Sequence, residues 1–377
     1  MHNYDFEMKQ GLRSDVVNNS IHISFIGDMY LGTQTQLSLA PSILKILEGS
    51  DLVIGNQEGP ICNTANSIKG KCCLKSTPET ADILKKWGVN VVSLANNHMF
   101  DYGRDGFKQT RELLEKAQIV YLGAGKNLDE ATKPLILEVK GLKIGLLAYS
   151  WGFVQTTCAT ENSFGCAPLD TELMVAQIGK LKNQVDAVIV MPHWGYCEYL
   201  FPTPEQVEMG KLLVGAGAAA VIGYHSHIVQ GLVKENNSLI AYSLGNFAFA
   251  EFEDRGRPSK LTKDNMRGVI LKVEIAPGKI ISQDIIFTKQ KGNIIELDRS
   301  AERAKDFDCR SEVLKSEKYG DYWLSYTRKR LFKRILYWCN IFNWQYMHVE
   351  TFVGFWLMLK GLFKKGNAGQ RDKKYNG

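Results

Sequence analysis

The fold is decided by the stretch Ile21-His22-Ile23-Ser24-Phe25-Ile26-Gly27-Asp28, a short β-type run that ends in a glycine and a carboxylate. Similar apolar runs recur along the chain, and each is closely followed by polar side chains: Leu52-Val53-Ile54 by Glu58, Val89–Leu94 by Asn97 and His98, Ala187–Met191 by His193, and Ala218–Ile222 by His225 and His227. Capped helical segments separate these runs. Short apolar strands that alternate with helices predict an α/β fold with buried, largely parallel sheets.

Residue types also mark the helices and the later strands. Thr77-Pro78 begins one helix, and a capping box of Thr203 and Gln206 begins another. Further helices are expected at about 105–117 and 171–184, and a hairpin at 135–139 and 143–149. The β-type runs at 239–243, 268–275 and 280–287 indicate an added antiparallel portion.

The charge of the 377-residue chain is concentrated at its C-terminal end. The formal net charge is +6, but from Leu314 onward there are 13 Lys and Arg against 4 Asp and Glu, which leaves about −3 for the rest. A general nucleic-acid-binding protein would carry basic residues on its folded body, so no nucleic acid partner is expected.

Cysteine spacing and the N-terminal segment indicate the compartment. The 8 cysteines are irregularly spaced and contain no CxxC motif, which favours mostly free thiols. Residues 1–20 read as a flexible leader without the apolar region of a signal peptide, and no apolar run reaches the ~20 residues of a spanning helix. We therefore expect a cytoplasmic protein, with a peripheral place at the inner face of the membrane as an option.

The polar residues that follow the strands form a candidate metal site. Ligands in α/β proteins gather at the carboxyl ends of strands. Carboxylates, an amide oxygen and several imidazoles suit Mn, Fe or Zn, and two such ions can act together on a phosphoryl group. Each residue also has an ordinary structural interpretation, such as a turn for Asp28, a solvated loop charge for Glu58, helix capping for Asn97 and a packed core position for His193. The joint pattern favours the metal site, because the structural interpretation needs several coincidences.

Seven motifs in order over about residues 21–290 resemble the poly-γ-glutamate capsule-synthesis protein family (CapA type). They are Gly27-Asp28-Met29-Tyr30-Leu31-Gly32, Asp51–Pro60, Val91–His98 with Asp101-Tyr102-Gly103, Tyr121–Gly125, His193-Trp194-Gly195, Gly223–Gly231 and Tyr242–Phe247.

The resemblance implies a fold and a set of roles. The fold would be that of calcineurin-like metallophosphoesterases, a four-layer α-β-β-α sandwich of two packed mixed sheets, followed here by a C-terminal helical appendix. Two divalent ions (Mn, Fe or Zn) would be bound. Asp28 and His227 would hold one, Glu58 would bridge, and Asn97, His193 and His225 would hold the other. His98 would act as general acid, and Asp101 would orient it or, as a structural alternative, form a turn or helix cap.

The chain departs from the family pattern at three positions. Tyr30 stands where phosphoesterases often have a histidine ligand. The segment His193–Tyr199 is one residue longer than usual, so Glu198 is expected to lie differently. Ser226 replaces a common proline between the two histidines, which are both retained.

The domain prediction is a leader at 1–20, a catalytic-type domain at 21–295, a basic aromatic helical appendix at 300–363 and a flexible tail at 364–377. Residues 326–363 could contact an anionic membrane surface or subunits of a polymer synthase, or pack on the protein itself as a helical hairpin.

Three functions remain open at this stage. The leading one is a metal-dependent, phosphoesterase-type hydrolase or transferase in the synthesis or export of a capsular polymer, acting on a polymer or phosphoester substrate. The second is a non-catalytic subunit of a membrane-associated polymer synthase, and the third a nucleotide phosphatase or nuclease.

Overall fold

The computed structural model describes residues 20–339 except 34–35, 153–154, 236 and 255–256. Residues 1–19 of the predicted leader, residues 340–363 of the predicted appendix and the whole predicted tail lie outside the described residues. The chain divides into two compact units at Tyr319 and Gly320. The predicted boundary lay near residue 300. The difference is helix α7 (Ala301–Leu314), which belongs to the first unit, where Leu232 N donates to Ser311 Oγ at 3.0 Å.

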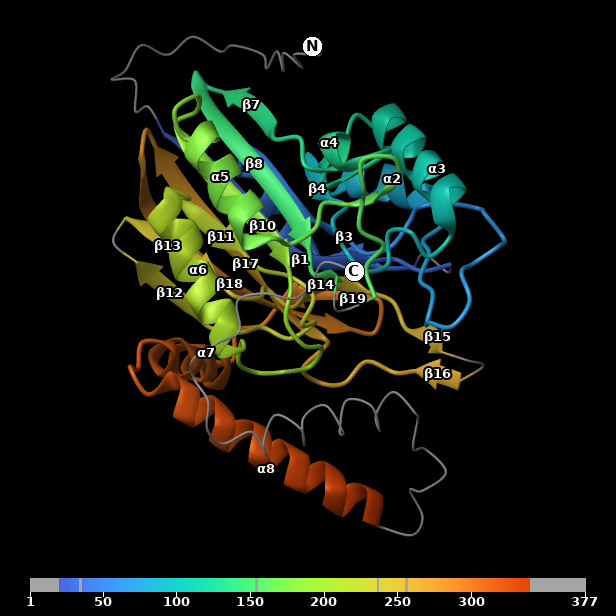
Figure 1. The fold of residues 1–377 in the computed structure, drawn as a ribbon. Coiled ribbons are helices and arrows are strands. Elements are labelled where there is room, and N and C mark those ends of the chain that lie inside the picture. The colour runs from blue at the N-terminus through green and yellow to red at the C-terminus, as the bar shows by residue number, and fades with distance from the viewer. Residues whose placement is uncertain (1–19, 34–35, 153–154, 236, 255–256, 340–377) are drawn as a thin grey trace. The chain divides into compact units, whose positions relative to one another are not determined.

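Two mixed sheets form the first unit (Figure 1). The larger sheet contains β1 (Ile21–Tyr30), β2 (Ser38–Leu39), β3 (Leu52–Gln57), β4 (Val91–Ser93), β5 (Val120–Leu122), β14 (Asn246–Phe249), β17 (Arg267–Ala276), β18 (Lys279–Lys291) and β19 (Ile294–Leu297). The second sheet contains β7 (Leu135–Val139), β8 (Leu142–Ser150), β10 (Ala187–His193), β11 (Ala220–Ile222), β12 (Leu232–Glu235) and β13 (Ser238–Ala241). Two small ribbons pair β6 (Ala124–Gly125) with β9 (Gly165–Cys166) and β15 (Phe252–Asp254) with β16 (Arg257–Ser259).

The central strands of both sheets are parallel, as predicted. Strand β1 pairs in parallel with β3, which continues in parallel to β4 and β5, and β10 lies between β8 and β11 in the same direction. The late strands β17, β18 and β19 form the antiparallel portion, and β7 with β8 forms the predicted hairpin. The carboxyl ends of the central strands can therefore supply side chains to one site.

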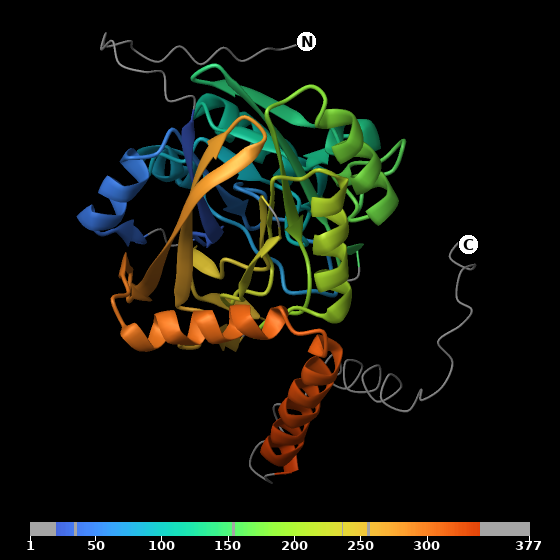
Figure 2. The same ribbon diagram turned by 90° about the vertical axis from the view of Figure 1, so that its left-hand side faces the viewer.

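Helices cover the outer faces of the stacked sheets. They are α1 (Pro41–Glu48), α2 (Glu79–Lys86), α3 (Gly103–Lys116), α4 (Leu128–Ala131), α5 (Thr171–Leu181) and α6 (Pro204–Ala216). Figure 2 shows α1 (blue) and the pair α5 and α6 (green) on opposite sides of the sheets. The capping box of Thr203 and Gln206 is present at the start of α6 as predicted. The four-layer α-β-β-α arrangement is confirmed.

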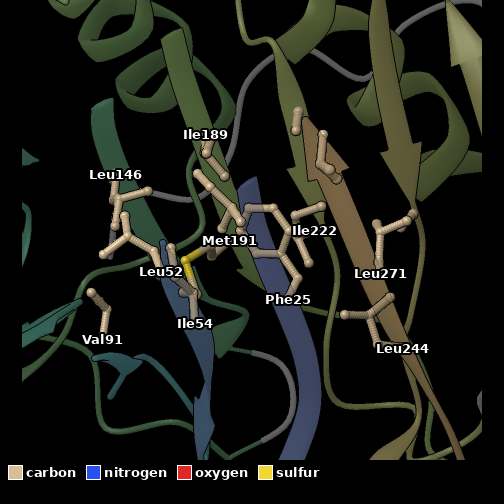
Figure 3. Close-up of a cluster of buried hydrophobic side chains, with 14 of the residues drawn as sticks. Phe25, Leu52, Ile54, Val91, Leu146, Ile189, Met191, Ile222, Leu244 and Leu271 are labelled. Atoms are coloured by element: carbon tan, nitrogen blue, oxygen red, sulfur yellow. The ribbon is translucent and has the colours of Figure 1, made fainter. Parts of the chain in front are cut away.

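An apolar core fills the space between the sheets. Figure 3 shows Phe25 and Ile54 from the larger sheet facing Ile189, Met191 and Ile222 from the second sheet, all at 0% exposure. A second cluster, which includes Ile26, Val92 and Phe107, packs between the larger sheet and its helices. Burial on both faces explains why the strands read as continuous apolar runs in the sequence.

The second unit contributes helix α8 (Tyr319–Cys339) to the described residues. Basic side chains are exposed on it at Arg328, Lys329 and Lys333. Within the described residues, no helix is long and apolar enough to cross a membrane. Seven cysteines are free thiols: Cys62, Cys72, Cys73, Cys158, Cys166, Cys197 and Cys309.

Candidate metal centre

The predicted site residues come together at the carboxyl ends of the central strands. The strand or loop that positions each is as follows: Asp28 near the carboxyl end of β1, Glu58 directly after β3, Asn97, His98 and Asp101 in the loop after β4, His193 as the last residue of β10, and His225 and His227 in the loop after β11. Three of these strands run further than predicted, among them β3, which reaches Gln57. Strand β1 continues to Tyr30 because its end pairs with β14 after a register shift, and β10 extends through His193.

Two carboxyl groups lie at the bottom of the site. Asp28 and Glu58 are both fully buried. The Asn56 amide donates one hydrogen bond to Asp28 Oδ1 at 2.8 Å and one to Glu58 Oε2 at 2.6 Å. The other oxygen of Asp28 accepts from the His225 backbone N–H at 3.2 Å, which links the two sheets across the site. Asn56 thus holds one oxygen of each carboxylate and leaves Asp28 Oδ2 and Glu58 Oε1 for other partners.

The imidazoles of His193 and His225 meet above these carboxyl groups. His193 Nε2 lies 2.9 Å from Asn97 Oδ1, 3.1 Å from His225 Nδ1 and 3.6 Å from Glu58 Oε1. One ring nitrogen carries at most one proton, so it cannot donate to all three of these atoms. Among the described residues, Glu58 Oε1 has no hydrogen-bond partner. Several hydrogen-bond acceptors therefore converge here with too few N–H or O–H donors to satisfy them.

Burial shifts the protonation of these groups toward their neutral forms. Desolvation raises the pKa of Asp28, and it raises the pKa of Glu58 well above its usual range with further help from the Asp28 charge. Desolvation, followed by the neighbouring histidines, holds the pKa of His193 and of His225 well below the ordinary value. Neutral imidazoles with available lone pairs are the form that binds metal ions.

The donor set fits divalent cations. Asp28, Glu58 and His193 form one group of possible ligands, and Cys197, His225 and His227 form another, with ligand atoms inside each group within 4.8 Å of one another. A cation would supply the positive charge that the paired buried carboxyl groups lack and would meet the lone pairs that no proton satisfies.

A buried ion-pair chain holds His98 beside this centre. His98 Nδ1 lies 2.6 Å from Asp101 Oδ2, and Asp101 Oδ1 lies 2.8 Å from Lys71 Nζ. Lys71 also donates to the Asn97 carbonyl at 2.5 Å, and Leu74 N donates to Asp101 Oδ2 at 2.8 Å. Desolvation lowers the pKa of His98, while the bond to Asp101 opposes that shift. Asp101 therefore fixes the ring and favours its protonated form.

The loop that carries His225 and His227 has a constrained backbone. Their φ angles are 90° and 56°, in the left-handed region that costs a side-chain-bearing residue about 1–2 kcal/mol. His227 Nδ1 lies 3.0 Å from Asn246 Oδ1, and Asn246 donates to the Asn265 carbonyl at 3.0 Å. With its Nδ1 proton on Asn246, His227 presents the lone pair of Nε2.

The three departures noted in the sequence have clear structural positions. The ring of Tyr30 packs in an aromatic cluster, with centroids 5.2 Å from Phe249 and 6.4 Å from Phe252. The longer segment after His193 places Cys197 Sγ 3.5 Å from His225 Nε2. Ser226 is buried, and its hydroxyl donates to the Ile228 carbonyl at 2.7 Å.

Four residues of the site were not identified from the sequence. Asn56 and Asn246 lie in recognised motifs, but the motifs assign them no role. Lys71 comes from a loop with no pattern, and Cys197 has no adjacent histidine in sequence. Only the folded chain brings these four to the site.

Comparisons with known proteins find relatives of this sequence. The profile of the family described as "Bacterial capsule synthesis protein PGA_cap" matches residues 21–251. The capsule biosynthesis protein CapA of Bacillus anthracis is 30% identical over 266 residues, which cover 66% of this chain and 65% of that protein. The PGA biosynthesis protein CapA of Bacillus subtilis strain 168 is 31% identical over 255 residues, which cover 65% of this chain and 67% of that protein.

Solved structures also resemble the chain. A hypothetical protein from Thermus thermophilus has 19% identity and a TM-score of 0.45, covering 72% of this chain and 100% of that one. A putative 5'-nucleotidase from Staphylococcus aureus has 13% identity and a TM-score of 0.47, covering 77% and 58%. The family profile spans more than half of the chain, and it ends within the two-sheet unit that carries the site. The chain therefore belongs to the PGA_cap family of bacterial capsule synthesis proteins.

Proposed function

We propose that this protein is a metal-dependent hydrolase or transferase that acts on a phosphoester, or on an amide-like linkage, during the synthesis or export of a capsular polymer. One observation carries the proposal: two buried carboxyl groups and three imidazoles converge at the strand ends, with an oriented histidine beside them. The family assignment supports a role in capsule synthesis, and the name of the Bacillus subtilis relative supports poly-γ-glutamate as the polymer.

The cations would be held by the ligands that the sequence resemblance named, Asp28, Glu58, Asn97, His193, His225 and His227. Bound there, divalent cations would activate a water molecule and neutralise charge on a phosphoryl group. The Asn56 amide would keep the other oxygens of the two carboxylates, Asp28 Oδ2 and Glu58 Oε1, turned toward the centre.

His98 would move a proton at the leaving oxygen. Its Nδ1 edge is occupied by Asp101, so the Nε2 edge is the one left for the substrate. Asp101 stabilises the imidazolium against the effect of burial, which allows the ring to carry the proton that the leaving oxygen takes up. Lys71 would hold Asp101 in place from the other side.

The test is metal content together with turnover. Full-length protein purified without chelators should contain about two equivalents of transition metal by elemental mass spectrometry and should hydrolyse a generic phosphodiester. The double variant His193→Ala, His225→Ala should lose both properties. His22 lies in β1 but outside the centre, so the control variant His22→Ala should keep both the metal and the turnover.

A non-catalytic subunit of a polymer synthase is the second candidate. It is favoured by Tyr30, because an aromatic cluster takes the position of an expected nitrogen ligand. Metal-loaded protein with no turnover of phosphoesters or of poly-γ-glutamate would support this candidate. Absence of metal from the wild-type protein would contradict the metal-dependent function itself.

A further inference from the structure

Cys197 lies at the mouth of the metal centre, although no sequence motif marks it as a ligand. It lies in the segment after His193 that is one residue longer than the family pattern, and it is exposed. The next residue, Glu198, has a left-handed backbone with a φ of 61°, and its N–H donates to the Ser226 carbonyl at 2.8 Å. That hydrogen bond ties the Cys197 segment directly to the loop that carries His225 and His227.

The sulfur faces two imidazoles rather than an isolated one. Cys197 Sγ lies 3.5 Å from His225 Nε2, and one ligand atom from each of Cys197, His225 and His227 lies within 4.8 Å of the others. For a tetrahedral zinc ion with Zn–S of about 2.3 Å and Zn–N of about 2.0–2.1 Å, the sulfur and nitrogen ligands stand about 3.6 Å apart. The observed separation, which in the metal-free protein is that of an S–H···N hydrogen bond, also matches the spacing of two ligands on one ion.

His227 is arranged to serve as the third ligand. Asn246 Oδ1 occupies its Nδ1 edge at 3.0 Å, which leaves the Nε2 lone pair available. The remaining ligands are richer in oxygen: Asp28, Glu58 and His193 lie close together, and the amide oxygen of Asn97 lies 2.9 Å from His193 Nε2. The two groups adjoin, because His193 Nε2 lies 3.1 Å from His225 Nδ1 and His227 Nδ1 lies 3.5 Å from Asp28 Oδ2.

We propose that Cys197, His225 and His227 together bind one divalent cation of the zinc type, with Cys197 as a thiolate ligand. On binding, the sulfur–metal bond forms, the S–H bond breaks and the thiol proton leaves to solvent, with no change of oxidation state. This inference rests on the proposed metal-dependent function and specifies its ligand set. Thiolate favours zinc or cobalt over manganese, because the latter prefers oxygen ligands.

Cobalt binding to the full-length protein tests the inference. Co²⁺ bound to a thiolate gives an intense near-ultraviolet charge-transfer band in addition to its visible d–d bands. We expect this band in the wild-type protein, its loss in Cys197→Ser, and its retention in Cys309→Ser, which removes another exposed thiol. Zn²⁺ affinity should fall by at least about tenfold in Cys197→Ser, the lower bound for losing even an outer partner of a ligand, while Mn²⁺ affinity should change less.

A second measurement needs no variant. Zn²⁺ should protect Cys197 from alkylation by iodoacetamide in the wild-type protein, as read by peptide mass spectrometry, whereas Cys309 should react equally with and without the ion. Visible Co²⁺ bands without the thiolate band, or alkylation of Cys197 that Zn²⁺ does not slow, would overturn the thiolate ligand and leave the metal centre intact. No bound Co²⁺ at all would overturn the proposed function as well.

Discussion

Replacing Asn56 with alanine removes the two hydrogen bonds that hold the buried carboxyl pair. The amide donates to Asp28 at 2.8 Å and to Glu58 at 2.6 Å, and all three side chains are fully buried. A hydrogen bond to a charged group contributes about 1.5–3 kcal/mol, so two such bonds to fully ionised carboxylates would contribute about 3–6 kcal/mol. Burial raises the pKa of both carboxyl groups, which favours the lower end of this range. We therefore expect Asn56→Ala to lower the free energy of unfolding by about 3 kcal/mol in the metal-free protein.

The loss of unfolding free energy caused by Asn56→Ala should change with pH in one direction. The hydrogen bond from Asn56 lowers the pKa of Asp28 and of Glu58 against the larger effect of desolvation. Without Asn56 both folded-state pKa values rise further, while the unfolded state is unchanged. The folded variant then binds more protons than the folded wild type as pH falls from neutral through these raised values. By linkage, its deficit in stability becomes smaller on acidification.

Urea denaturation in EDTA, followed by tryptophan fluorescence at about pH 8 and about pH 5, measures this difference. Asn90→Ala is the matched control, because Asn90 accepts a hydrogen bond from Val53 N at 2.7 Å in the same sheet without contacting a carboxylate. It should cost about 1–3 kcal/mol at both pH values. An Asn56→Ala cost that is below about 1 kcal/mol, or that stays constant between the two pH values, would refute the account of the carboxyl pair.

Two other predictions concern the His98–Asp101 pair and helix α8. Asp101→Asn removes the carboxylate that opposes the effect of burial, so the pKa of His98 should fall further, as measured by NMR titration of the labelled ring; an unchanged or higher pKa would contradict the role of Asp101. We propose that helix α8 contacts an anionic membrane surface through its exposed basic residues. Changing Arg328, Lys329 and Lys333 to Gln should weaken flotation with anionic vesicles by about 3 kcal/mol, or roughly a hundredfold. Equal flotation of wild type and variant with anionic vesicles would argue against this contact.

The sequence was a good guide to the fold because the core is buried on both faces of each strand. Continuous apolar runs such as Ala187–Met191 stand out from their surroundings, and the capping box at Thr203 marks a helix start without reference to the rest of the chain. Strands of two to four residues, such as β2 and β14, carry no such pattern. Their positions depend on neighbours far along the chain, as in the pairing of Asp28 with Asn246.

The same distinction applies to the site. Glu58 and His193 follow clearly apolar strand sequences, so they could be identified as site candidates from the sequence. In the structure, Glu58 Oε1 and His193 Nε2 lie 3.6 Å apart. Lys71 and Cys197 come from irregular segments, where local sequence does not determine which way a side chain points. Contacts between residues distant in sequence are set by tertiary packing. Lys71 and Asn97, for example, are 26 positions apart in the chain.

The left-handed backbone at His225 and His227 costs folding stability, but it places two imidazoles in the metal centre. Glycine adopts those φ angles without steric cost, whereas each histidine costs about 1–2 kcal/mol. Glycine at either position would relieve this strain but would remove an imidazole from the centre. A variant engineered for higher thermal stability should therefore keep His225 and His227. Its stability should be raised elsewhere, for example by replacing Gly179 in α5, where an added Cβ meets open space.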